Sequence, residues 1–164
     1  MSRPITEYRC LLVSPGDVAE ERDALAKAVD RWNAQVGDAL DARVRLVRWE
    51  TDGVPDASAP PQQVLNRQIV DESDFGIALF WARLGTPTGT HAARSLEEIE
   101  QLLRRGARVL IYFKNAPVPQ ALLKDDQYDR VSDFKTKMEK EGLLGIFTEP
   151  TTSSSRYFFT SQAS

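Results

Sequence analysis

Three glutamates, Glu97, Glu98 and Glu100, stand close together just before the apolar run ARVLIYF at residues 107–113. Carboxylates can act as acids, bases or nucleophiles, and they can stabilise a cationic sugar while a glycosidic bond breaks. The apolar run predicts a buried strand. The sequence therefore places three potential catalytic groups beside an element that belongs to the core.

A helix over this segment separates the three carboxylates. Its apolar residues share one face: Leu96, Ile99, Leu102 and Leu103. Glu97 points away from that face, which is typical of a solvated charge, whereas Glu98 and Glu100 flank it. The residues Ser95-Leu96-Glu97-Glu98 also form a capping-box pattern, with Ser95 as the N-cap. Glu98 therefore has two interpretations, a helix cap and a catalytic carboxylate.

Composition excludes several other kinds of chemistry. His91 is the only histidine and Cys10 the only cysteine, which leaves little for a zinc site or a Ser-His-Asp triad, so we expect no metal. The formal net charge of -3 gives no electrostatic argument for nucleic acid or an anionic membrane as partner. No apolar run approaches a membrane span, and the N-terminus lacks the apolar core of a signal peptide. We therefore expect a cytoplasmic protein.

Strand and helix patterns alternate along the chain. Strands are expected over 8–14, 42–49, 74–81, 107–113 and 143–149, and helices over 17–36, 62–73, from 95, and 125–142. Asp17 and Glu20 form a capping-box pattern at the first helix. This alternation predicts a parallel sheet with helices on both faces. In such sheets ligands bind outside the carboxyl ends of the strands, which here means four loops: 14–17, 50–61, 81–94 and 114–120.

Residues beside these loops are candidates for substrate contacts. They are Ser14, Pro15, Gly16, Trp49, Trp81, Arg83 and Ser95. The turn after the first strand could hold a phosphate on its backbone N–H groups, or it could be a plain turn. The two tryptophans could stack on a base or belong to the core. The arginine could pair with a phosphate or with a structural carboxylate.

Several stretches resemble TIR domains. SLEEIEQLLRRGARVLIYF is similar to the segment around the catalytic glutamate of TIR domains and of nucleoside 2-deoxyribosyltransferases, in which a Gly follows the Glu by eight residues, as Gly106 follows Glu98 here. SPGDVAEERDAL, VRWETD and FWARLGTPTGT resemble a group of TIR-like N-terminal domains of unknown function more closely. The resemblance covers roughly residues 7–141.

This resemblance implies a fold and an activity. The expected fold is a flavodoxin-like or TIR-like α/β domain over residues 1–148, with a parallel sheet of about five strands. The Ser/Thr-rich tail at 149–164 is expected to be disordered or truncated. The implied activity is cleavage of the N-glycosidic bond of NAD or a related nucleotide by Glu98. NAD is then a substrate and no cofactor is implied.

The resemblance also implies a defence or signalling role, with self-association. Two alternatives remain open: a non-catalytic interaction module of a larger regulatory protein, and a nucleoside deoxyribosyltransferase.

Overall fold

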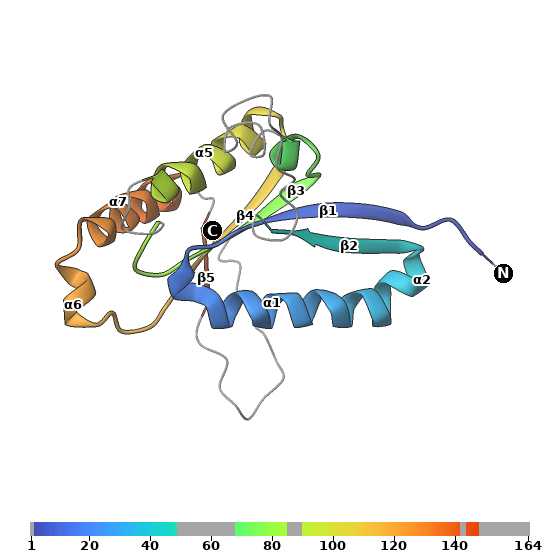
Figure 1. Ribbon diagram of the computed structural model, residues 1–164, viewed down its shortest axis with the longest axis horizontal. Helices are drawn as coiled ribbons and strands as arrows, with labels where there is room; N and C mark the ends of the chain where they lie inside the picture. The colour runs from blue at the N-terminus through green and yellow to red at the C-terminus, as the bar shows by residue number, and fades with distance from the viewer. Residues whose placement is uncertain (1, 49–67, 85–89, 142–143, 148–164) are drawn as a thin grey trace.

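The computed structural model describes residues 2–48, 68–84, 90–141 and 144–147, and these build a parallel sheet with the order β2-β1-β3-β4-β5 (Figure 1). The strands are β1 (Thr6–Val13), β2 (Ala42–Val47), β3 (Phe75–Phe80), β4 (Arg108–Lys114) and β5 (Leu144–Phe147). Every pair of neighbouring strands is parallel. This order is that of the flavodoxin-like doubly wound fold. The predicted fold class is therefore confirmed.

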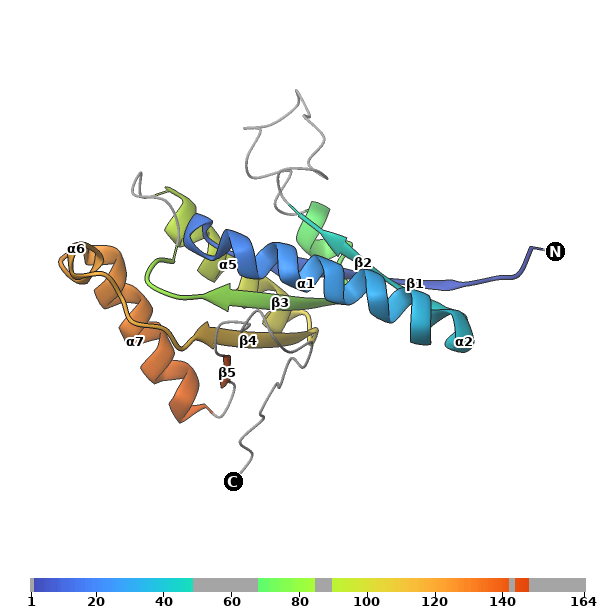
Figure 2. The same ribbon diagram turned by 90° about the horizontal axis from the view of Figure 1, so that it is seen from below.

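Helices cover both faces of the sheet. They are α1 (Ala19–Trp32), α2 (Asp38–Leu40), α5 (Thr90–Arg104), α6 (Gln120–Leu123) and α7 (Asp126–Lys140). A short 3₁₀ helix, Gly16–Val18, precedes α1, and a π-helical turn, Asn33–Gly37, joins α1 to α2. Figures 1 and 2 show α1 on one face and α5 and α7 on the other. Within the described parts of the chain, no helix is both long and apolar enough to cross a bilayer.

The larger part of the core lies between the sheet and the pair α5 and α7. Phe80 and Phe113 point to this side from neighbouring strands, and Phe134 of α7 packs on both, with ring centroids 5.5 and 6.0 Å away. Gly76 of β3 leaves room for the Leu102 side chain of α5, since a Cβ added at Gly76 would lie 2.6 Å from Leu102 Cδ1.

The smaller part of the core lies under α1. Leu12, Val18 and Leu79 are buried there, and Trp81 and Tyr112 pack against them. A buried ion pair closes this layer at its carboxyl end, where Lys114 Nζ of β4 lies 2.5 Å from Glu21 Oε1 of α1. Both side chains are only 7% exposed, so α1 is tied to β4 by charge as well as by apolar contact.

The amino ends of β1 and β2 extend together beyond the start of β3. Strand β1 pairs with β2 from Thr6 onward, whereas its pairing with β3 begins only at Cys10. On the outer side of β2, the side-chain amide of Asn33 donates to Val44 O at 2.9 Å and accepts from Val44 N at 2.8 Å. The π-helical turn that starts at Asn33 thus supplies hydrogen bonds to the edge strand.

Two predicted helix starts are wrong. Asp17 lies in the 3₁₀ helix and makes no cap hydrogen bond, because α1 begins at Ala19. Ser95 does not open α5, which begins at Thr90, so the expected capping box from Ser95 to Glu98 does not stand at a helix terminus. The expected loop 50–61, Trp49 and the tail 149–164 lie outside the described residues.

Candidate functional site

The carboxyl ends of β1, β3 and β4 lie at one rim of the sheet, as parallel pairing requires. β1 leads to α1 and β4 leads to α6 and α7, while α5 returns from the loop that follows β3. Figures 1 and 2 show the start of α1, the start of α5 and the α6–α7 segment at the same end of the molecule. We call this end the carboxyl rim. Ligands of doubly wound folds bind there.

Glu98 lies on the buried stripe of α5. It is 5% exposed, and Ser95, which precedes it on the stripe, is 9% exposed. The same stripe continues as Ile99 and Leu102, which belong to the core between α5 and the sheet. Because α5 begins at Thr90, Glu98 lies more than two turns inside the helix. Helix capping therefore does not explain the carboxylate.

The neighbouring glutamates lie on the outside of α5. Glu97 is exposed, as the helical periodicity predicts. Glu100 is exposed as well, and its Oε2 lies 3.1 Å from Arg104 Nη2 one turn later. Glu98 is thus the only one of the three whose carboxylate lies inside the protein. Buried carboxylates are uncommon in proteins, because burial is costly for a charged group unless other groups compensate for it.

Asp17 is a rim carboxylate that the sequence interpretation assigned to helix capping. Its Oδ2 accepts a hydrogen bond from the backbone N–H of Ala82, 3.0 Å away, in the segment after β3. Its Oδ1 is buried and has no hydrogen-bond partner in the described structure. Burial raises the pKa of Asp17, an effect that the Ala82 N–H and the Arg83 guanidinium oppose. The sequence feature that could have identified Asp17 as a rim residue is its position directly after the Pro-Gly turn that ends the first strand.

Arg83 forms a structural ion pair. Its Nη2 lies 3.7 Å from Oδ2 of Asp125. Asp125 is the N-cap of α7, where its Oδ1 accepts from the N–H of Gln127 at 3.1 Å. The Nε of Arg83 is buried without a hydrogen-bond partner among the described residues. Of the two alternatives for Arg83, the structure shows the pair with a carboxylate, while phosphate binding stays a prediction.

Trp81 belongs to the layer under α1 rather than to the layer of Glu98. Its Nε1 donates to the carbonyl oxygen of Ala116 at 3.2 Å. The Nζ of Lys114 lies 4.7 Å from the centre of a Trp81 ring and restrains the indole. The structure therefore places Trp81 and Glu98 on opposite faces of the sheet. Trp49, the second predicted stacking residue, lies outside the described residues.

The turn after β1 has no phosphate-binding loop pattern of its own. Ser14 is half-buried, Pro15 is buried and Gly16 is exposed. The carbonyl oxygen of Pro15 accepts from Val18 N at 3.4 Å, which closes the 3₁₀ turn. A Cβ at Gly16 would meet no atom within 4 Å, so this glycine is not required by close packing. Phosphate binding at the turn stays a prediction.

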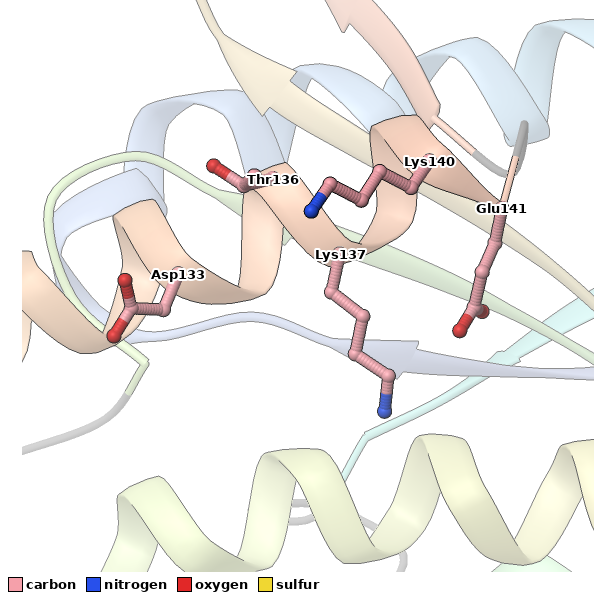
Figure 3. A pocket seen from close by; sticks show the side chains of 5 residues that line it. All are labelled: Asp133, Thr136, Lys137, Lys140 and Glu141. Carbon is pink, nitrogen blue, oxygen red and sulfur yellow. The ribbon is translucent and has the colours of Figure 1, made fainter.

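A hollow of about 320 Å³ lies away from these residues, on the C-terminal half of α7 (Figure 3). Its described lining is Asp133, Thr136, Lys137, Lys140 and Glu141. The charges are mixed, and none of the predicted site residues contributes. Nowhere in the described ranges do three or more His, Cys, Asp or Glu side chains gather in a way that could hold a metal ion.

Comparison with known proteins gives one family match. The model of a family described as "Domain of unknown function (DUF4062)" matches residues 14–157. No curated protein matches the chain. Among solved structures, the chain is similar to the TIR domains in the structure of the activated Roq1 resistosome directly recognizing the pathogen effector XopQ. That similarity has 10% identity and a TM-score of 0.47, over 82% of this chain and 74% of the other.

Proposed function

We propose that this chain, which belongs to the DUF4062 family, is a TIR-like nucleotide-binding domain that cleaves the N-glycosidic bond of NAD or a related nucleotide. The resemblance of its sequence to TIR domains supports this proposal, and it also suggests a defence or signalling role. NAD would be consumed as a substrate. Glu98 is the catalytic carboxylate of the proposal.

The observation that carries the proposal is the burial of Glu98 inside α5. The carboxylate is 5% exposed, and it continues the stripe of Ile99 and Leu102 towards the carboxyl rim. The simplest alternative, a capping box with Ser95, fails because the helix begins at Thr90. A buried carboxylate on a helix that starts at the ligand-binding end of a doubly wound sheet is a candidate for chemistry.

One carboxylate is sufficient for this reaction. The bond between the ribose C1′ and the nicotinamide nitrogen breaks, and its electron pair stays on the nitrogen, so nicotinamide leaves as a neutral molecule. The sugar acquires positive charge, which a carboxylate stabilises directly or by forming a covalent adduct. Water then adds at C1′ and loses a proton. No strong acid is needed, which fits a chain with a single histidine.

The Glu98→Gln variant tests the proposal. Glutamine has the same shape, so the packing of α5 should survive, whereas a neutral amide stabilises no cationic sugar and is no carboxylate nucleophile. We expect nicotinamide release from NAD, measured by chromatography, to fall by about a thousandfold or more. Glu97→Gln removes the same charge from the exposed side of α5 and should leave both the rate and the melting temperature unchanged.

Two results would contradict the assignment. The first is a wild-type protein that releases no nicotinamide even at concentrations where it self-associates. The second is equal cleavage by the wild type and Glu98→Gln, which would move the chemistry to another group. Circular dichroism on each variant ensures that a lost rate is not a lost fold.

A second candidate function is a non-catalytic interaction module, and one observation favours it. Five large apolar side chains are exposed near the amino end of β1 and the C-terminal end of α1: Ile5, Tyr8, Trp32, Val36 and Leu40. Exposed apolar groups that gather at one end of a domain are typical of protein contacts. Self-association without any NAD cleavage would support this function.

A further inference from the structure

Two buried polar atoms without partners belong to the two segments that meet where the strand order reverses. They are Oδ1 of Asp17, after β1, and Nε of Arg83, after β3, and neither has a hydrogen-bond partner among the described residues. The hydrogen bond from Ala82 N–H to the other Asp17 oxygen, 3.0 Å long, holds the two segments together. In the sheet, β2 lies on one side of β1 and β3 lies on the other, so the direction in which successive strands are added reverses at β1. In this fold type, that switch point is where ligands bind.

The chemistry of the two atoms restricts what can bind them. Buried polar atoms are nearly always hydrogen-bonded, so an unpaired acceptor and an unpaired donor at a ligand-binding position indicate a ligand that serves both. A phosphate is disfavoured by the Asp17 carboxylate, and a cation is disfavoured by the Arg83 guanidinium. The group must therefore be neutral and able to donate and accept. Sugar hydroxyls have both properties, and acidic residues bind ribose hydroxyls in other doubly wound folds.

The two side chains lie close to the surface. Arg83 keeps 30% of its side chain exposed, and Asp17 is half-buried as a residue. The two atoms themselves are buried, so a ligand would reach them by a rotation of these partly exposed side chains. Asp125 keeps the Arg83 guanidinium at the rim, since its Oδ2 lies 3.7 Å from Nη2 and leaves Nε uninvolved.

We propose that Asp17 and Arg83 bind the 2′- and 3′-hydroxyls of a ribose, with the Asp17 carboxylate accepting from one hydroxyl and Arg83 Nε donating to the other. This inference rests on the nucleotide-binding function proposed above and narrows its substrate class to ribonucleotides. A deoxyribose lacks one of the two hydroxyls and would leave a buried atom of the protein unpaired. The proposal therefore excludes the deoxyribosyltransferase alternative.

The test compares two sugars on the full chain. D-Ribose 5-phosphate and 2-deoxy-D-ribose 5-phosphate differ only in the hydroxyl at position 2, and their binding can be followed by NMR titration. We expect the wild type to bind the ribose compound at least about tenfold more tightly, because a site built around a hydroxyl rejects the analogue that lacks it. Equal binding of the two sugars, or binding of neither, overturns the proposal.

Two variants connect the preference to these side chains. Asp17→Asn keeps an oxygen for the Ala82 N–H but turns the other atom into a donor. Arg83→Lys keeps a positive charge beside Asp125 but removes Nε. In each variant the two sugar phosphates should bind with about equal affinity. If both variants still bind ribose 5-phosphate more tightly than the deoxy compound, the assignment is contradicted. Glu20→Gln removes an exposed charge next to this segment and should keep the preference.

The outcome is independent of catalysis. A wild-type protein that prefers ribose 5-phosphate but releases no nicotinamide from NAD would support this inference and reject the proposed reaction. A protein that cleaves NAD but binds the two sugar phosphates equally would support the proposed reaction and reject this inference. The wild-type comparison decides the matter even if a variant fails to fold, as judged by circular dichroism.

Discussion

Asp17 is the residue whose environment departs most from what its position in the sequence indicates. It follows a Pro-Gly turn and precedes a helix, yet its carboxylate bonds to Ala82 rather than to the helix terminus. Burial raises its pKa, because the ionised form loses hydration that nearby backbone N–H groups, Ala82 first among them, and the Arg83 charge replace only in part. The folded protein therefore favours the protonated form of this side chain more than the unfolded chain does.

This pKa shift predicts a pH-dependent effect of Asp17→Asn. A carboxyl whose pKa is higher in the folded state destabilises the fold at neutral pH, and this penalty disappears as the pH falls through the folded pKa towards the unfolded value near 4. Asparagine carries no such penalty. The melting temperature of the variant relative to wild type should thus be highest near pH 7 and should decline on acidification. A difference that stays constant between pH 7 and pH 4 would contradict the raised pKa.

At the scale of elements, the ion pair between Glu21 and Lys114 fastens α1 to β4. Removing one partner leaves the other charge buried, so Glu21→Gln should destabilise the protein by about 3 kcal/mol in urea denaturation. Replacing both partners, as Glu21→Leu with Lys114→Met, should recover most of this loss, because apolar residues of similar volume tolerate the site. Glu20→Gln is the exposed control, with an effect within about 0.5 kcal/mol. If the double variant lost as much unfolding free energy as the two single variants lose together, the two side chains would not be coupled.

The joint between α1 and β2 depends on Gly37. Glycine to alanine within a helical segment is ordinarily stabilising by up to about 1 kcal/mol. At Gly37 the sign should reverse, because the added Cβ would lie 2.5 Å from the carbonyl oxygen of Ala42, which is backbone and cannot rotate away. We expect a loss of about 1 to 3 kcal/mol. Gly16→Ala, with no atom within 4 Å of the new Cβ, should be neutral or slightly stabilising. Equal melting temperatures for the two variants would contradict this prediction and show that the backbone at Gly37 and Ala42 can move apart.

At the scale of the whole molecule, the two ends differ in chemical character. The carboxyl rim carries Asp17 and the ion pair of Glu21 with Lys114, whereas the opposite end exposes apolar side chains, including Leu40 of α2, which is 63% exposed. If this end mediates self-association, Leu40→Glu should shift sedimentation velocity profiles towards the monomer. Its melting temperature should change little, because the side chain contributes little to the core. Leu123→Glu at α6, on a leucine that is 44% exposed, is the matched control and should leave association intact.

The fold was predictable because its strands are short buried runs separated by helical patterns. The run 107–113, for example, became β4 with a shift of one residue. The helix starts were less predictable, because a capping-box pattern depends only on neighbouring residues. Neither Asp17 nor Ser95 is the N-cap of its helix in the structure. The carboxylate of Asp17 has a partner 65 residues away in the sequence. Ser95 is buried within a helix that extends upstream to Thr90.

The candidate site was predictable only in part for the same reason. The position of Glu98 beside the apolar face follows from its spacing of four residues from Leu102, and the structure buries both. The position of Trp81 depends on Lys114 and Ala116, which reach it from a different strand and loop. Asp17 and Arg83 come together only once β1 and β3 pair. Periodicity identifies what faces the core, but contacts between distant loops require the folded sheet.

The amide of Asn33 has a consequence for how copies of this domain can assemble. An uncovered edge strand is a template on which another chain can add a strand, and such growth leads to aggregates. By occupying both the N–H and the C=O of Val44, Asn33 interrupts that template in the middle of β2. A filament of this domain, if one forms, would therefore have to be held together by side-chain surfaces, with each subunit keeping its own sheet, and would not be continued by backbone pairing across β2.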